Sequence, residues 1–280
     1  MIPNGQKIFV GGYGSIHIWD WQAKTIQSRK LQDYLKYINL FAISPDKQLI
    51  IGGDNKLLKL WDWQTGNMKN IFQEYTLKNK TEIIYLDDQI IIFRHYNSKV
   101  ITVQNWYTGE NFGNIYENRY VSKVAISLDR KTLVTYGNHI NIWNLPTGEL
   151  KYTIEDDNIH RFSDLSISSD GQTLVTGDAI IKVWDLHTGK IQKKLGRKKF
   201  DNKQYHSVYY LTISPDGDTL ITASSDSTLK VWNLHTGELQ YILEGYSRKI
   251  DYIVFSPDGQ IIVTSSDRTI KVWGMPFQYH

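Results

Sequence analysis

One segment recurs seven times along the 280-residue chain, and this repetition constrains the fold more than any other feature. The copies read IHIWDWQAK, LKLWDWQTG, ITVQNWYTG, INIWNLPTG, IKVWDLHTG, LKVWNLHTG and IKVWGMPFQ. They are centred on Trp19, Trp61, Gln104, Trp143, Trp184, Trp232 and Trp273, with 39 to 48 residues between consecutive centres. A period of about 40 residues indicates an array of equivalent structural units.

A second motif recurs in phase with the first. It reads Ser-x-Asp followed by Lys, Arg or Gly, and it begins at Ser44, Ser127, Ser168, Ser214 and Ser256. Pro presets φ at the second position of a turn, and Gly accepts a positive φ without steric cost. Each copy therefore predicts a tight hairpin between two strands.

One complete unit predicts four strands. Residues 211–224, LTISPDGDTLITAS, read as strand, turn and strand, and they are followed by LKVW, a turn at His235–Gly237 and LQYIL. No segment has the period of a helix. The sequence therefore predicts one all-β domain over residues 1–280, built from units of four antiparallel strands.

These motifs carry a resemblance to the WD-repeat (WD40) family, and the resemblance covers the chain from about Gly5 to Trp273. It implies a seven-bladed β-propeller whose blades are four-stranded antiparallel sheets. It also implies two loop-lined faces that are available to partners.

The two ends of the chain depart from this pattern. Residues 2–6, Ile-Pro-Asn-Gly-Gln, resemble the hairpin turn, so the first strand of the first unit is missing. The seventh unit ends after its third strand. We therefore expect a propeller that is incomplete at its closure seam. Either the natural chain starts further upstream, which we favour, or another chain covers the open edge.

The resemblance also implies a polar network within each blade that links a His, a Ser or Thr, an Asp and the Trp. The Thr-Asp-Trp part matches at three places, the second unit keeps Asp54 with Trp61, and the Trp alone matches at Trp19 and Trp143. No His aligns, and the last unit has Gly245-Tyr246 where Gly-His is common. We therefore expect incomplete networks and a fold held mainly by apolar packing. The three matching sets are Thr176, Asp178, Trp184; Thr222, Asp226, Trp232; and Thr264, Asp267, Trp273.

Composition excludes several kinds of chemistry. The chain contains no Cys, which rules out disulfides, thiolate metal sites and a Cys nucleophile. No phosphate-binding loop, zinc-protease motif or nucleophile elbow occurs. We expect neither catalysis nor a cofactor or metal site. Without a signal peptide or an apolar run of about 20 residues, the expected location is cytoplasmic.

The net charge is only +3, but residues 190–203 carry seven basic residues against Asp201 alone. The unusually long spacing between Trp184 and Trp232 places this segment in an enlarged loop between blades. It is either a solvated loop or a surface that attracts phosphates and acidic groups.

The main expected function is a non-catalytic scaffold or adaptor that binds protein partners through its loop-lined faces. The alternative is an anion-binding module that uses residues 190–203 to bind nucleic acid, which is not favoured, or an acidic membrane. We expect a monomer that binds through residues of the blade-joining loops. The candidates are Lys193, Lys194, Arg197, Lys198, Lys199, Arg119, Tyr120, Arg161, Tyr246 and Arg248.

Overall fold

The computed structural model describes most of the chain, and every regular element in the described part is a β-strand. The described residues are 7–12, 15–20, 23–30, 40–44, 46, 48–53, 58–72, 81–95, 99–117, 121–137, 139–155, 164–178, 180–196, 207–246, 248–266, 269–275 and 278–279.

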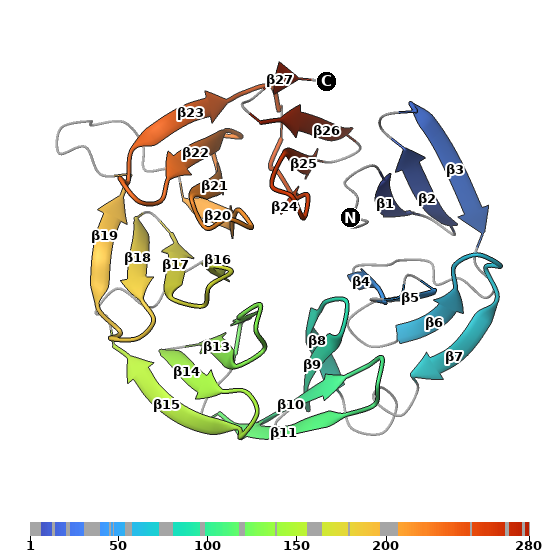
Figure 1. Ribbon diagram of the computed structural model, residues 1–280, viewed down its shortest axis with the longest axis horizontal. Coiled ribbons are helices and arrows are strands. Elements are labelled where there is room, and N and C mark those ends of the chain that lie inside the picture. Colours follow the sequence, from blue (N-terminus) through green and yellow to red (C-terminus); the bar gives the residue numbers. More distant parts are fainter. Residues whose placement is uncertain are drawn as a thin grey trace.

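The strands form seven separate antiparallel sheets, which Figure 1 shows arranged in a ring. The N-terminal sheet has three strands, β1 (Lys7–Gly12), β2 (Ser15–Asp20) and β3 (Thr25–Lys30). The next three sheets have four strands each: β4 (Leu40–Ile43), β5 (Leu49–Gly53), β6 (Leu58–Asp62), β7 (Met68–Phe72); β8 (Thr81–Leu86), β9 (Ile90–His95), β10 (Val100–Asn105), β11 (Asn111–Tyr116); and β12 (Lys123–Ile126), β13 (Thr132–Tyr136), β14 (Ile140–Asn144), β15 (Glu149–Ile154).

The last three sheets also have four strands each. They consist of β16 (Asp164–Ile167), β17 (Thr173–Gly177), β18 (Ile181–Asp185), β19 (Ile191–Leu195); β20 (Val208–Ile213), β21 (Thr219–Ser224), β22 (Leu229–Asn233), β23 (Leu239–Leu243); and β24 (Tyr252–Phe255), β25 (Ile261–Ser266), β26 (Thr269–Gly274), β27 (Gln278–Tyr279). Each blade is named below by its strands.

The architecture is an all-β propeller, but the predicted number of blades is wrong. The described residues form six four-stranded blades rather than seven, because the first repeat unit supplies only three strands. The expected absence of a fourth strand in the last unit is also wrong. The short strand β27 pairs with β26, with Tyr279 opposite Trp273 and Gln278 opposite Gly274.

Burial changes across each blade from the centre of the ring to its rim. The middle strands β17 and β18 are buried along almost their whole length, whereas β19 and β23 at the rim are mostly exposed. Neighbouring blades cover both faces of the middle strands, which explains why segments such as LVTG and IKVW consist mostly of apolar or small residues.

The hydrophobic core lies between blades. Trp184 of β18 packs with Tyr136 and Ile142 of the preceding blade, and Trp232 of β22 packs with Val175 and Val183. Trp19 of β2 packs in the same way against the Ile261, Val263 and Val272 cluster of the β24–β27 blade. Apolar packing therefore continues from the last blade to the N-terminal sheet.

Candidate functional site

The Ser-x-Asp motifs form one repeated hairpin turn, which confirms the prediction. In all five copies the Ser is buried, and its Oγ accepts the backbone N–H of the fifth following residue at 2.9 Å. The Ser hydroxyl donates to Oδ1 of the Asp two residues later. That Oδ1 also accepts the backbone N–H of the second residue after the Asp at 2.9–3.1 Å. The motif residues are therefore fully used by the turn.

These turns predict a loss of stability in acid. Hydrogen bonds from the Ser hydroxyls are the main cause that holds the pKa of Asp46, Asp129, Asp216 and Asp258 below 3.8. A carboxyl whose pKa is lowered on folding stabilises the fold above its unfolded pKa, and this contribution is lost as the pH falls through the folded pKa. We expect the urea midpoint to fall as the pH drops below 3.8.

A matched variant tests whether the turns cause this loss. Ser256→Ala removes the hydrogen bond that lowers the pKa of Asp258. The difference in unfolding free energy between the wild type and Ser256→Ala should narrow as the pH falls from 5 to 2. A difference that stays constant over this range would show that the turn carboxyls do not contribute.

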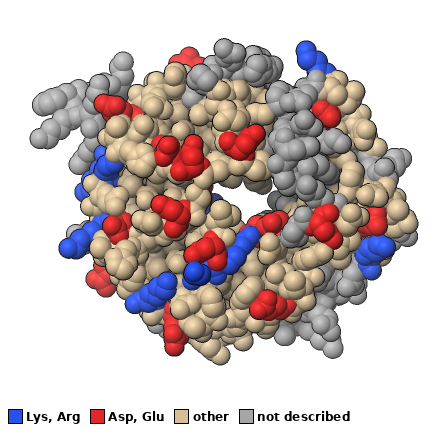
Figure 2. Space-filling view, in the orientation of Figure 1, with Lys and Arg blue, Asp and Glu red and all other residues tan. Residues whose placement is uncertain are grey.

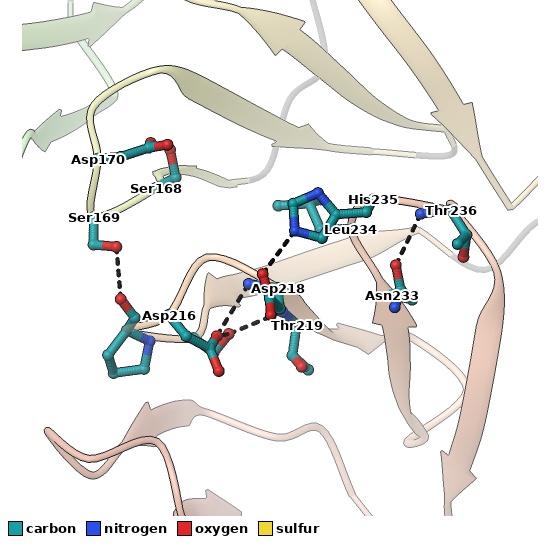
Figure 3. A network of polar contacts seen from close by, with 12 residues as sticks. Ser168, Ser169, Asp170, Asp216, Asp218, Thr219, Asn233, Leu234, His235 and Thr236 are labelled. Carbon is teal, nitrogen blue, oxygen red and sulfur yellow. Dashed lines mark hydrogen bonds and ion pairs between the residues drawn. The ribbon is translucent and has the colours of Figure 1, made fainter.

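Neighbouring turns on the same face are also linked to each other, as Figure 3 shows. The Ser169 hydroxyl donates to the carbonyl of Pro215 in the next blade at 2.6 Å. Within the β20–β23 blade, His235 Nε2 lies 2.7 Å from Asp218 Oδ1. This contact gives His235 a partner within its own blade, in agreement with its interpretation as a turn residue.

A buried Thr–Trp hydrogen bond recurs in four blades. The Trp Nε1–H donates to the Thr Oγ1 at 2.8–3.0 Å in the pairs Trp143–Thr135, Trp184–Thr176, Trp232–Thr222 and Trp273–Thr264. Three of these pairs were predicted. The sequence analysis missed Thr135, although Thr135 precedes Trp143 by eight residues, as Thr176 precedes Trp184.

Two blades replace the missing His with another side chain. The Glu117 carboxyl accepts the Thr135 hydroxyl, and its two oxygens accept Asn141 Nδ2 at 3.1 and 3.0 Å. In the last blade the Tyr246 hydroxyl bonds Thr264 Oγ1. In these two blades another side chain therefore takes the place of the missing His. Among the described residues, no buried side-chain nitrogen or oxygen lacks a partner.

The predicted Asp members have a different role. Asp226 accepts the Thr228 backbone N–H at 3.0 Å and hydroxyl at 2.7 Å, and it pairs with Lys230 Nζ at 3.0 Å. Burial raises its pKa, but the bonds from Thr228 and Lys230 outweigh burial and lower it. Asp226 thus fixes its own turn, and the Asp178 side chain is half-buried. Asp267 lies outside the described residues.

We expect Asp226→Ala to lower the free energy of unfolding by at most about 1 kcal/mol, since only bonds of a partly exposed turn are lost. Thr222→Val should cost more, about 1–3 kcal/mol, because the buried Trp232 Nε1–H would lose its acceptor. Urea denaturation of both variants measures the difference. The reverse order would mean that Asp226 belongs to the buried network.

The structure places the predicted binding residues in different settings. Lys193 and Lys194 lie in β19 rather than in a loop between blades. Lys193 Nζ donates to the carbonyl oxygens of Leu234, at 3.1 Å, and His235 in the next blade. Tyr152 at the equivalent place in β15 donates to the Leu186 carbonyl. Lys193 therefore ties two blades together, and Lys194 is exposed.

Tyr246 and Arg248 lie in the segment between β23 and β24, where Tyr246 is half-buried and Arg248 is exposed. The other candidates lie outside the described residues. These are Arg119, Tyr120, Arg161, Arg197, Lys198 and Lys199.

Repeated blades with a buried Trp, a Thr partner and a Ser-x-Asp hairpin define a propeller of the WD-repeat class. The family model described as "WD domain, G-beta repeat" (WD40) matches residues 28–62, 148–185, 198–233 and 237–274, together more than half of the chain. The chain belongs to the WD40 family. Propellers of this family generally serve as protein-interaction scaffolds. A search of curated proteins finds no match. No helix in the described residues is long and apolar enough to cross a membrane.

Proposed function

We propose that this chain is a non-catalytic scaffold that binds a protein partner through the described residues between β23 and β24, 244–246 and 248–251. The observation that carries the proposal is a fixed backbone beneath exposed cations. The Ile250 N–H donates to the Tyr209 hydroxyl at 2.8 Å, and the Ser266 hydroxyl bonds the carbonyls of Arg248 and Lys249 at 3.3 and 2.8 Å. Ile250 itself is fully buried.

Aromatic side chains hold the cations of this region. Lys249 Nζ lies 4.4 Å from the centre of the Tyr209 ring, and Lys271 Nζ lies 4.2 Å from that of Tyr246. Lys271 also donates to the carbonyl of Gly245 at 2.5 Å. A surface that is already ordered loses little conformational entropy on binding. Arg and Tyr are also among the residues that contribute most at protein interfaces.

The distribution of charge favours a protein partner over a nucleic-acid track. On the face seen in Figure 2, acidic and basic side chains both lie beside the central opening, and further Lys and Arg lie toward the rim. The proposed segment carries Glu244 and Asp251 beside Arg248 and Lys249. Mixed charge suits complementary contacts with another protein, whereas a nucleic-acid surface is strongly basic.

The test compares partner capture by two double variants of the chain. Arg248→Ala with Lys249→Ala removes both exposed cations of the segment. The control, Lys131→Ala with Lys190→Ala, removes two exposed cations from turns between the first and second strands and between the third and fourth strands. Successive antiparallel strands turn at opposite ends of a blade, so the control residues lie on the opposite face.

Cross-linking in the native host followed by mass spectrometry should yield a protein partner that the first variant loses and the control keeps. Equal loss in both variants, or equal retention, would refute the proposed face. Binding to nucleic acid or anionic vesicles that weakens steeply with salt would support the anion-binding alternative instead.

A further inference from the structure

Side chains at one repeated position link the innermost strands of successive blades. Asp164, the first residue of β16, accepts the backbone N–H of Leu211 in β20 at 3.0 Å. Tyr210, at the equivalent place in β20, forms a hydrogen bond with the backbone of Ile253 in β24. In these two blades the side chain four residues before the turn Ser reaches the main chain of the next inner strand, and Lys123, at the same place in β12, pairs with Asp164 at 3.4 Å.

Tyr252 holds this place in the last blade, and it is far more exposed than its counterparts. Its side chain is 58% exposed, and Val254 two residues later is 43% exposed. The equivalent residues in β12, β16 and β20 are all buried or half-buried. Tyr252 and Val254 lie at the junction with the N-terminal sheet, where Trp19 covers only the cluster of β25 and β26.

Among the described residues, the N-terminal sheet has no inner strand that would cover them. Its order is β1–β2–β3, and within the described residues β1 pairs on one side only, with β2. Ile8 lies opposite Trp19, as Ile50 of β5 lies opposite Trp61. The strand β1 therefore corresponds to the second strand of a blade, and its open edge is the side on which β4 pairs with β5.

We propose that this edge binds an extended segment of a partner protein by strand addition. The segment would pair with Lys7–Gly12 and pack two apolar residues, at alternate positions, against Tyr252 and Val254. In β16, β20 and β24 the residues one and three places before the turn Ser pack on the preceding blade in this way. Main-chain pairing supplies affinity in such complexes, and alternate side chains supply specificity.

The repeat also specifies how the segment ends. In the complete blades the turn Ser accepts an N–H from the start of the second strand, as Ser44 does from Leu49. Lys7 occupies the place of Leu49 in β1. The matching partner sequence is therefore apolar-x-apolar-Ser-x-Asp, in which the Ser accepts the N–H of Lys7.

The probe is the labelled peptide YYLTISPD, which has the sequence of residues 209–216. We expect saturable binding to the 280-residue chain by fluorescence anisotropy and slower hydrogen exchange at the amides of residues 7–12. Tyr252→Ala should weaken binding roughly tenfold. Tyr116→Ala, which changes a 71% exposed Tyr of β11, should leave it unchanged. The control peptide YYDTDSPD should not bind.

Four results would each overturn the proposal. These are no protection of residues 7–12 by the peptide, full protection of these amides without it, equal binding of the control peptide, and dimers in sedimentation that would show a second copy at the edge. The Arg248→Ala and Lys249→Ala variant should bind the peptide normally, so this proposal and the proposed function fail separately.

Discussion

Glu117→Ala should lower the free energy of unfolding by about 3 kcal/mol, because its buried carboxyl accepts hydrogen bonds from two side chains of the blade. Glu117 is only 7% exposed, and it accepts the Thr135 hydroxyl and Asn141 Nδ2. Thr135 in turn accepts Trp143 Nε1–H at 2.8 Å. Removing the carboxyl leaves these donors without an acceptor inside the blade, and the truncation also leaves a cavity.

Urea denaturation of three variants tests this network. The control Glu110→Ala removes an exposed Glu between β10 and β11, in the chain segment that leads to Glu117. It should change the free energy of unfolding by less than about 0.5 kcal/mol. Thr135→Val combined with Glu117→Ala should cost less than the sum of the two single changes, since both act on one network. Additive losses, or a Glu117→Ala loss below about 1 kcal/mol, would show that the network contributes little.

Arg130→Ala should cost about 2 kcal/mol through the loss of a contact between blades. Arg130 stands where three other copies of the hairpin have Gly, and it keeps the positive φ of 60° that suits Gly. Its guanidinium bonds Asp87, and it also bonds Asp88 Oδ1 at 3.0 Å in the β8–β11 blade. Burial, followed by the nearby Asp87 charge, raises the pKa of Asp88.

Arg130→Gly separates the two effects at this position. Glycine also loses the contact with Asp87 and Asp88, but it adopts the positive φ without strain. We expect it to be more stable than Arg130→Ala by about 1 kcal/mol. Thermal unfolding of both variants, with Lys131→Ala as an exposed control, measures the difference. An Arg130→Gly variant as stable as the wild type would mean that the contact adds nothing.

Features that repeat with the period could be predicted from the sequence. The Ser-x-Asp turns, the strands around them and three of the Thr–Trp pairs depend on local spacing, and the structure contains them. The number of complete blades could not be predicted in the same way. It depends on pairing at the two ends, where β27 has only two residues and lies outside the repeated motif.

Contacts between repeat units leave no repeated motif in the sequence. Lys193 reads as one cation of a basic run, but its partners are main-chain carbonyls 41 and 42 residues further along. A backbone carbonyl has no residue type, so sequence cannot identify it as a partner. Glu117 was missed for a related reason: a Glu stands in a network where the family pattern has a His, and only its burial beside Thr135 reveals the role.

The Ser-x-Asp turn has a consequence for how such a chain evolves. All of the turn's own bonds from Ser and Asp close within five residues, so a duplicated unit inherits a complete turn and a deleted unit takes its turn away. Bonds such as that from Lys193 to Leu234 must instead be matched again at each new junction. Selection after duplication should therefore fall mainly on the junctions between units, while the turns persist unchanged.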